Sequence, residues 1–224
     1  MSSRHSLACT AIAAWCGLAL SGCSERPAPP PPAPVSAPAK PAPAVPPLFD
    51  DATGESGIAF RHVNGRTGHF YYPEIIGAGV AILDYDNDGR YDILAIQGGE
   101  LANLTPAMAK GPCGARLYHN ELVVNADGTR SLRFTDVTQG SGLCTHGYGM
   151  GVAVGDYDND GCIDVFVTYF GAPSQLFHNN CNGTFTDVTR KAGVAGNGRW
   201  GASATFFDYD RDGRLDLFVV NYVD

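Results

Sequence analysis

Three short segments of the chain hold aspartates at a spacing that could bind a cation. Each follows the pattern Asp-x-Asp-x-Asp-Gly-x-x-Asp, and together they contain twelve of the 23 acidic residues. Four carboxylates in so small a loop repel one another unless a cation lies among them. The segments run from Asp84 to Asp92, from Asp156 to Asp164 and from Asp208 to Asp216.

Calcium is the cation that these donors predict. Ca²⁺ takes roughly six to eight oxygen ligands in a flexible shell. Carboxylates at loop positions 1, 3, 5 and 9 and a backbone carbonyl at position 7 would supply them, and the glycine at position 6 permits the sharp bend. The predicted ligands, with position 7 acting through its carbonyl, are Asp84, Asp86, Asp88, Arg90 and Asp92; Asp156, Asp158, Asp160, Cys162 and Asp164; and Asp208, Asp210, Asp212, Arg214 and Asp216.

The loops differ from EF-hands, in which position 12 supplies a glutamate. Ala95, Val167 and Val219 stand at that position here. For one isolated segment, an Asp-Gly turn without metal is the alternative interpretation. Three copies in one frame of a longer repeat favour about three calcium sites.

The loops recur inside a repeat that predicts short β-strands. Their first aspartates stand 72 and then 52 residues apart, and the longer interval is assigned to an insertion at 100–114 and a longer loop at 123–130. An apolar run follows each loop, and Leu-x-His-Asn and Phe-Thr-Asp-Val-Thr follow the first two runs. Four strands per unit predict an all-β fold, a β-propeller with about two and a half blades present. A β-sandwich is the alternative.

A weaker copy of Phe-Thr-Asp-Val-Thr, at 49–53, precedes the first loop. In a closed propeller this leading strand would complete the last blade. Since known propellers have at least four blades, we expect the sequence to be the N-terminal part of a longer protein.

The combination of Asp-Tyr-Asp-Asn-Asp-Gly, Leu-Phe-His-Asn-Asn and Gly-Thr-Phe-Thr-Asp-Val-Thr resembles the FG-GAP/VCBS repeats of integrin α-subunits, and most of all the cartilage acidic protein (ASPIC/UnbV) group. The resemblance covers residues 48–224. It implies an integrin-like propeller with calcium between strands one and two of several blades. It also implies a role in adhesion or in protein or ligand recognition outside the cell.

The N-terminal residues predict an exported lipoprotein. A basic start at Arg4 and an apolar run over 7–20 precede Leu20-Ser21-Gly22-Cys23, which resembles a bacterial lipobox. Residues 1–22 are therefore predicted to be a signal peptide, and Cys23 to be lipidated. The alternative is an ordinary signal peptide that contains a cysteine. Residues 23–47, rich in proline and alanine, form a predicted extended linker.

Charge and location limit the partners. Loss of Arg4 with the signal changes the net charge from −8 to −9, which argues against a nucleic-acid partner because such a partner requires a basic face. We expect a membrane partner through the lipid anchor, an unidentified protein or glycan partner, and a place in the bacterial cell envelope. The resemblance to bacterial lipoprotein signals implies the outer membrane, because Ser24 and not aspartate follows the cysteine.

Four cysteines beyond Cys23 are expected to form disulfides, because an even number in an exported domain favours pairing over free thiols. The blade topology implied by the resemblance suggests the partners. It places Cys162 and Cys181 in two turns that share one end of a blade. Cys113, between strands two and three, and Cys144, before the next blade's first strand, both face the other end. We therefore predict the pairs Cys113–Cys144 and Cys162–Cys181.

The sequence favours a binding module over an enzyme. It has no Gly-x-Ser-x-Gly, no His-Glu-x-x-His and no phosphate-binding loop. His119 and His178 occupy equivalent repeat positions, which favours a structural role, and His146 lies in a glycine-rich loop. The alternative function is a calcium-dependent enzyme acting on polysaccharide or lipid. Residues that could line a binding surface are His62, His69, Tyr71, Tyr72 and Glu74.

Overall fold

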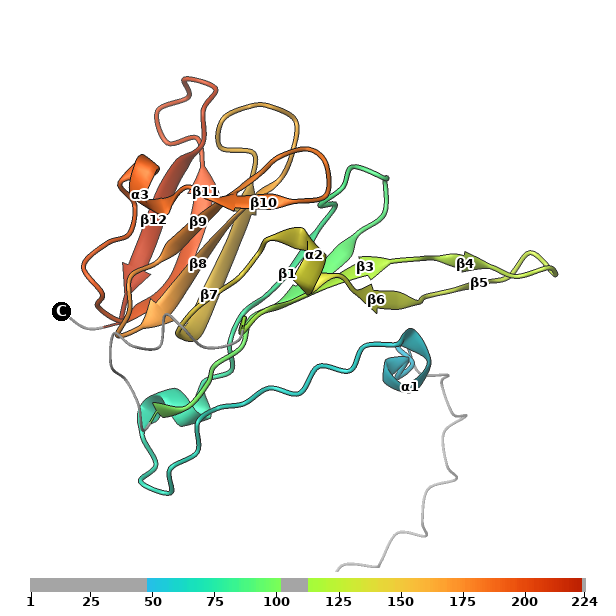
Figure 1. Ribbon diagram of the computed structural model, residues 1–224, viewed down its shortest axis with the longest axis horizontal. Helices are drawn as coiled ribbons and strands as arrows, with labels where there is room; N and C mark the ends of the chain where they lie inside the picture. Colours follow the sequence, from blue (N-terminus) through green and yellow to red (C-terminus); the bar gives the residue numbers. More distant parts are fainter. Residues whose placement is uncertain (1–47, 102–112, 223–224) are drawn as a thin grey trace, which may run out of the picture. The chain divides into compact units, whose positions relative to one another are not determined.

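A computed structural model describes residues 48–101 and 113–222 of the chain (Figure 1). The predicted signal peptide, Cys23 and the linker lie outside the described residues, as does most of the 100–114 insertion. Residues 48–224 form a compact unit of their own. Among the described residues, no helix has the length and apolar character needed to cross a bilayer.

Two four-stranded antiparallel sheets confirm the predicted blades. Each sheet has its strands in sequence order, apart from a small hairpin inserted in the first. The strands of the first sheet are β1 (Val80–Leu83), β2 (Asp92–Ala95), β3 (Arg116–Asn120) and β6 (Phe134–Asp136). Those of the second are β7 (Tyr148–Gly155), β8 (Asp164–Phe170), β9 (Gln175–Asn179) and β10 (Phe185–Asp187).

The third unit contributes one antiparallel pair to the described part of the chain. Its strands are β11 (Gly201–Phe207) and β12 (Asp216–Asn221). The three sheets together correspond to the two and a half blades that the repeat predicts. All three Asp-rich loops are the connections between the first and second strands of a unit, as Figure 1 shows.

Apolar side chains from neighbouring sheets fill the space between them. Leu94 and Leu117 of the first sheet share a fully buried cluster with Val165, Val167 and Phe177 of the second. Each such side chain contributes about 1.5–3 kcal/mol to folding through burial. The third pair packs on the second sheet through a separate cluster around the buried side chain of Phe166.

Glycines at the start of β7 allow this close approach. A Cβ at Gly149 would lie 2.3 Å from a methyl group of Ile96, and a Cβ at Gly151 would lie 2.9 Å from the carbonyl oxygen of Ala202. In the second unit, the Gly-x-Gly element is therefore a packing requirement between blades, because a larger residue would push the sheets apart.

A short helical turn follows each Phe-Thr-Asp-Val-Thr motif. The turns are α1 (Thr53–Ser56), α2 (Thr138–Ser141) and α3 (Thr189–Ala192). In all three, the aspartate two positions before the threonine accepts a hydrogen bond from the threonine N–H. The leading copy at 49–53 thus forms the same turn. Residues 49–52 are not a strand in the structure, because no neighbouring strand pairs with them among the described residues.

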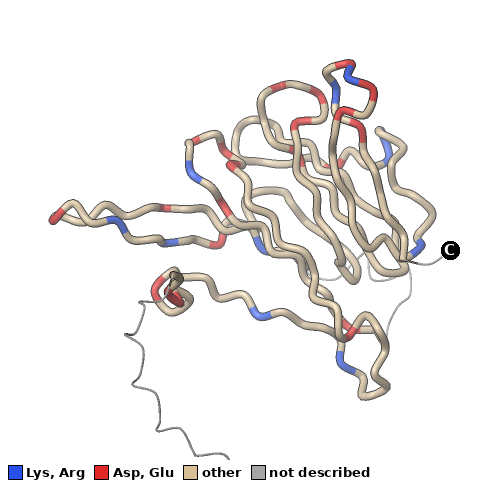
Figure 2. Tube along the Cα trace, turned by 180° about the vertical axis from the view of Figure 1, so that it is seen from behind, with Lys and Arg blue, Asp and Glu red and all other residues tan. Residues whose placement is uncertain are grey.

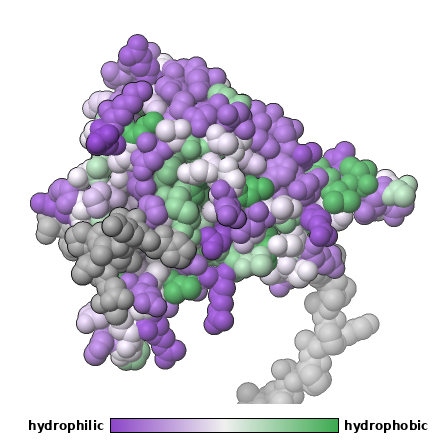
Figure 3. Space-filling model, in the orientation of Figure 1, coloured by the Kyte–Doolittle hydropathy of each residue, from purple (hydrophilic) through white to green (hydrophobic). Residues whose placement is uncertain are grey.

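The 123–130 segment, expected to be a loop, is largely a β-hairpin. Its strands are β4 (Val123–Val124) and β5 (Arg130–Ser131). The reason is local: Gly128 adopts a φ of +82°, and Asn125 N–H donates to the Thr129 carbonyl, which closes the turn. Exposed valines make this hairpin one of the more hydrophobic surfaces in Figure 3.

Candidate functional site

The first aspartate organises each Asp-rich loop. One of its carboxylate oxygens accepts the N–H of loop position 5, and the other accepts the N–H of position 6. The distances are 3.0 and 2.9 Å for Asp84, 3.0 and 2.8 Å for Asp156, and 3.1 and 3.0 Å for Asp208. The same sequence pattern therefore folds into the same turn three times.

Two positions of each loop take a left-handed conformation. The glycine at position 6 has a φ between 81° and 89° in all three loops, a region that glycine enters without steric cost. Position 4 is also left-handed, with φ of 59° at Asn87, 61° at Asn159 and 64° at Arg211. Asparagine tolerates this conformation better than arginine does.

The position-4 asparagines also connect one loop to the next. Asn87 Nδ2 donates to the Gly161 carbonyl at 3.1 Å, and Asn159 Nδ2 donates to the Gly213 carbonyl at 3.0 Å. The three loops therefore form a hydrogen-bonded row across neighbouring units. Sequence analysis missed this connection, although the asparagine recurs in the first two loops.

The ninth-position aspartate ties each loop to its sheet. It is paired with the residue just before the loop, so that it stands at the base of the turn. Asp92 and Asp164 are fully buried. Asp164 accepts the Tyr157 N–H at 3.1 Å and the Asn179 N–H at 2.8 Å. Burial nevertheless raises the pKa of Asp164 to about 6, and it raises the pKa of Asp92 as well.

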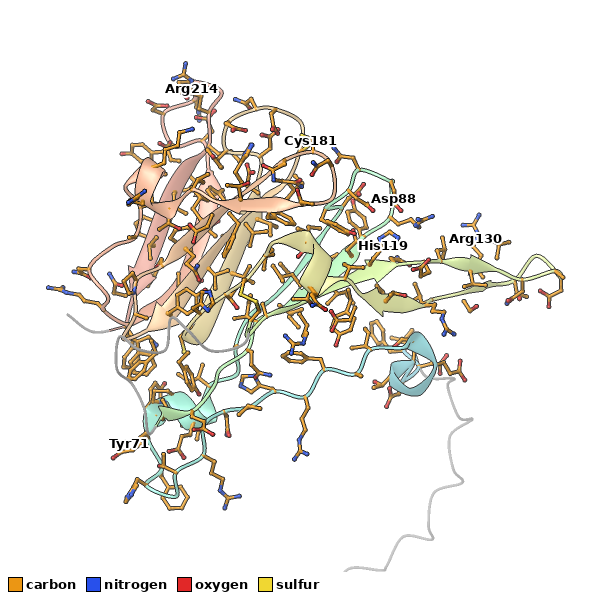
Figure 4. The ribbon with its side chains drawn as sticks, in the orientation of Figure 1. Tyr71, Asp88, His119, Arg130, Cys181 and Arg214 are labelled. Carbon is orange, nitrogen blue, oxygen red and sulfur yellow. A yellow bond between two sulfur atoms is a disulfide. The ribbon has the colours of Figure 1, made fainter. Side chains whose placement is uncertain are left out.

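The Leu-x-His-Asn motif of the third strand supports this aspartate. The asparagine N–H donates to the carboxylate of Asp92 or Asp164, and the asparagine side chain donates to the carbonyl of loop position 8. The preceding histidine lies over the loop. Nδ1 of His119 is 3.3 Å from Asp92 Oδ1 and 3.4 Å from Asp86 Oδ2, and Figure 4 shows His119 beside the loop that carries Asp88.

The second sheet repeats this histidine contact. Nδ1 of His178 is 3.2 Å from Asp164 Oδ1 and 3.4 Å from Asp158 Oδ2. Sequence analysis assigned these histidines a structural role from their repetition. It missed that both imidazoles contact the loop carboxylates, and the signal was that a Leu-x-His-Asn motif follows each of the first two Asp-rich loops.

Both predicted disulfides are present. Cys162 at position 7 of the second loop is bonded to Cys181, with 5.6 Å between the Cα atoms. Cys113 is bonded to Cys144, with 4.8 Å between the Cα atoms. The Cys162–Cys181 bridge joins the second Asp-rich loop to the turn between β9 and β10. Figure 4 shows Cys181 at the same end of the sheet as that loop.

The side chains of the loops fit a hard cation. Carboxylate oxygens of Asp84, Asp86 and Asp88 lie within 4.8 Å of one another, as do those of Asp156, Asp158 and Asp164. Oδ1 of Asp86 is buried and has no hydrogen-bond partner among the described residues. Figure 2 shows the acidic residues gathered in these loops at one end of the sheets. Such a set of oxygen donors suits Ca²⁺.

A second feature is a pocket of about 1020 Å³ formed mainly by residues 61–67. His62, His69 and Tyr71 line it, as their sequence positions suggested. Tyr72 does not line it, since its ring packs against Trp200 and Tyr222.

The other two candidates also lie apart from the lining of this pocket. Glu74, in the 3₁₀ turn η1 (Tyr72–Ile75), is buried and binds Thr67. His146 N–H donates to Gln175 Oε1 in the second sheet.

The fold and the loops place the chain in a family. It belongs to the FG-GAP-like repeat family, whose sequence model matches residues 84–167 and 156–219, more than half of the chain. The matched segments contain the three Asp-rich loops and the strands from β2 to β11.

Particular relatives are cartilage acidic protein 1 of Mus musculus, Homo sapiens and Xenopus tropicalis. The mouse and human proteins are 32% and 31% identical over 146 residues, which cover 65% of this chain and 21% of each relative. The frog protein is 28% identical over 189 residues, or 75% of this chain and 27% of the relative. The chain thus spans about a fifth to a quarter of the length of these curated relatives.

Proposed function

We propose that this chain is a membrane-anchored, calcium-binding recognition module of the cell envelope, built on propeller blades. The observation that carries the proposal is the threefold recurrence of one aspartate-organised turn, in phase with the sheets. In this proposal the ions bind between the first and second strands of each unit, where they hold the loops in a row and rigidify the surface that meets a partner.

Thermal unfolding of the purified chain tests the calcium part. We expect a calcium-specific rise in the midpoint that saturates with about three ions per chain, while magnesium has little effect. A site filled at about 100 times its Kd stabilises the folded state by about 2.7 kcal/mol. Each of the variants Asp84→Asn, Asp156→Asn and Asp208→Asn should remove one ion. A folded chain without any calcium response would contradict the proposal.

Envelope location rests on two supports. The two disulfides and the FG-GAP-like repeats fit an extracytoplasmic protein. The lipid anchor rests on the lipobox-like sequence at Cys23. Metabolic labelling with palmitate should mark the wild-type chain and leave Cys23→Ala unlabelled. Equal labelling of both would contradict lipidation at this cysteine.

Binding without turnover is the expected activity. The alternative, a calcium-dependent enzyme acting on polysaccharide or lipid, is favoured by the two histidines that line the pocket. Turnover that is lost in His62→Gln or His69→Gln, but kept in His178→Gln, would support the enzyme. Calcium-dependent adhesion with no turnover in any of these proteins would support the recognition module.

A further inference from the structure

The pocket formed by residues 61–67 lies away from the Asp-rich loops. Figure 4 shows Tyr71, at the edge of the pocket, on the opposite side of the sheets from Asp88, Cys181 and Arg214. Its volume of about 1020 Å³ is at the upper end of the range for small-ligand sites. A ligand in this pocket would therefore not contact the Asp-rich loops.

The wall of the pocket is held rigidly. The Glu74 carboxylate accepts the Thr67 hydroxyl at 2.6 Å, and Asn64 Nδ2 donates to the Glu74 carbonyl at 2.7 Å. The buried Tyr148 hydroxyl lies 3.0 Å from the Asn64 carbonyl and 2.9 Å from that of Pro73. Because Tyr148 belongs to β7, the loop is fixed to the second sheet, and a ligand would meet a preformed surface.

The backbone of this wall is paired with residues 97–99 on one side. Val63 N–H donates to Gln97 Oε1 at 2.6 Å, and the Val63 carbonyl accepts the Gly99 N–H at 2.8 Å. The Arg61 carbonyl accepts from Gln97 Nε2. These bonds hold the segment in place, and the side chains of the lining remain available to a ligand.

Those side chains are cationic in an otherwise acidic molecule. Arg61 and Arg66 line the pocket and form no ion pair within the part of the chain that the structure describes. Glu100 is the one acidic residue of the lining, against a net charge of −8 for the chain. Figure 2 shows the basic residues of the segment before η1 apart from the acidic loops. Unpaired guanidinium groups suit a carboxylate ligand.

Two aromatic rings complete the edge of the pocket. The rings of His69 and Tyr71 are 5.7 Å apart, and 54% of the Tyr71 surface is exposed. Between them, Phe70 holds a φ of +58° with 82% of its surface exposed. This backbone conformation is unfavourable for a bulky residue and is common at ligand sites. An exposed ring with a polar edge packs well against the C–H face of a sugar.

We propose that this pocket binds a short acidic saccharide, with a uronic-acid carboxylate paired to Arg61 or Arg66 and a sugar ring against Tyr71. This names the ligand class of the recognition module and rests on the proposed function. It does not depend on the metal loops, because none of the lining residues belongs to them.

Calorimetric titration of the full chain with trigalacturonate tests the site. Its methyl ester is the matched neutral probe, and an acidic tetrapeptide is the non-saccharide probe. We expect trigalacturonate to bind at least about tenfold more tightly than either, as charge-assisted hydrogen bonds and ring packing together would give. The double variant Arg61→Gln/Arg66→Gln should lose the preference over the ester, and Tyr71→Ala should weaken both saccharides.

Arg130→Gln is the control, since Arg130 is exposed on the β4–β5 hairpin far from Tyr71 in Figure 4. It should bind as the wild type does. Equal affinity for acid and ester, an unchanged preference in the double variant, or equal binding of the peptide would overturn the proposal. Calcium-dependent melting of the same samples separates the two ideas, because loss of the pocket leaves the calcium response intact.

Discussion

The second and third Asp-rich loops have the same internal hydrogen bonds but different surroundings. In both, the first aspartate accepts the N–H groups of positions 5 and 6, and the ninth accepts the N–H of position 2. Around the second loop, β9 adds Asn179 and His178, and the turn after β9 adds a disulfide. Around the third, no such strand is present among the described residues, and Asp216 is exposed where Asp164 is buried.

The difference separates two levels of organisation. The nine-residue sequence is enough to set the turn, because its hydrogen bonds are local and its left-handed positions are occupied by residues that allow them, at least in the first two loops. Burial of the ninth-position carboxylate depends on the third strand of the unit, which lies outside the nine-residue segment. Substitutions in the two loops and a change of pH test whether these levels are separate, and their expected effects decrease in the order given.

The two loops should differ most in the unfolding free energy that is lost when the ninth-position aspartate is replaced. Asp164→Asn places an amide where two backbone N–H groups need acceptors inside the core, and we expect it to cost about 3–4 kcal/mol of unfolding free energy. Asp216→Asn, at an exposed site with one such bond, should cost about 1 kcal/mol. Denaturant unfolding in calcium measures both. Similar costs would show that the third strand contributes little.

The disulfide between Cys162 and Cys181 should contribute somewhat less. It closes a short loop between two turns of one sheet, and removing it by Cys162→Ser/Cys181→Ser should cost about 3 kcal/mol. The third loop has Arg214 at the equivalent position and should keep its calcium affinity in this variant. A fall in affinity at all three loops would mean that the row of loops acts as one unit.

A matched pair of substitutions tests the position-4 residues. Asn159→Ala loses the hydrogen bond to Gly213 and puts alanine in a left-handed conformation, so we expect a cost of about 2 kcal/mol. Arg211→Ala replaces one poorly suited residue by another and should be nearly neutral. Thermal melting of both variants in calcium gives the comparison. A neutral Asn159→Ala would rule out a significant link between the second and third loops.

What the sequence predicted depends on local pattern. Consecutive residues determine the Asp-rich turns and the strand order of the blades, whereas both disulfides were predicted from the blade topology that the family resemblance implies. The contact of His119 with Asp92 was missed because it joins residues from different strands, whose side-chain directions a repeat does not give. The pairing of Val63 with Gln97 was missed for the same reason, whereas the hairpin at β4–β5 was missed because it lies in a segment that the other units do not repeat.

The smallest effect concerns pH. Without calcium, burial raises the pKa of Asp164 from 3.8 to about 6, so the folded chain binds this proton more tightly than the unfolded chain does. Its contribution therefore stabilises the calcium-free fold as pH falls, by about 1 kcal/mol between pH 7 and pH 5. Bound calcium keeps the carboxylate ionised, so the calcium-induced rise in melting midpoint should be smaller at pH 5 than at pH 7. Asp164→Asn should show a weaker pH dependence in the calcium-free state, and an identical dependence would place the titration elsewhere.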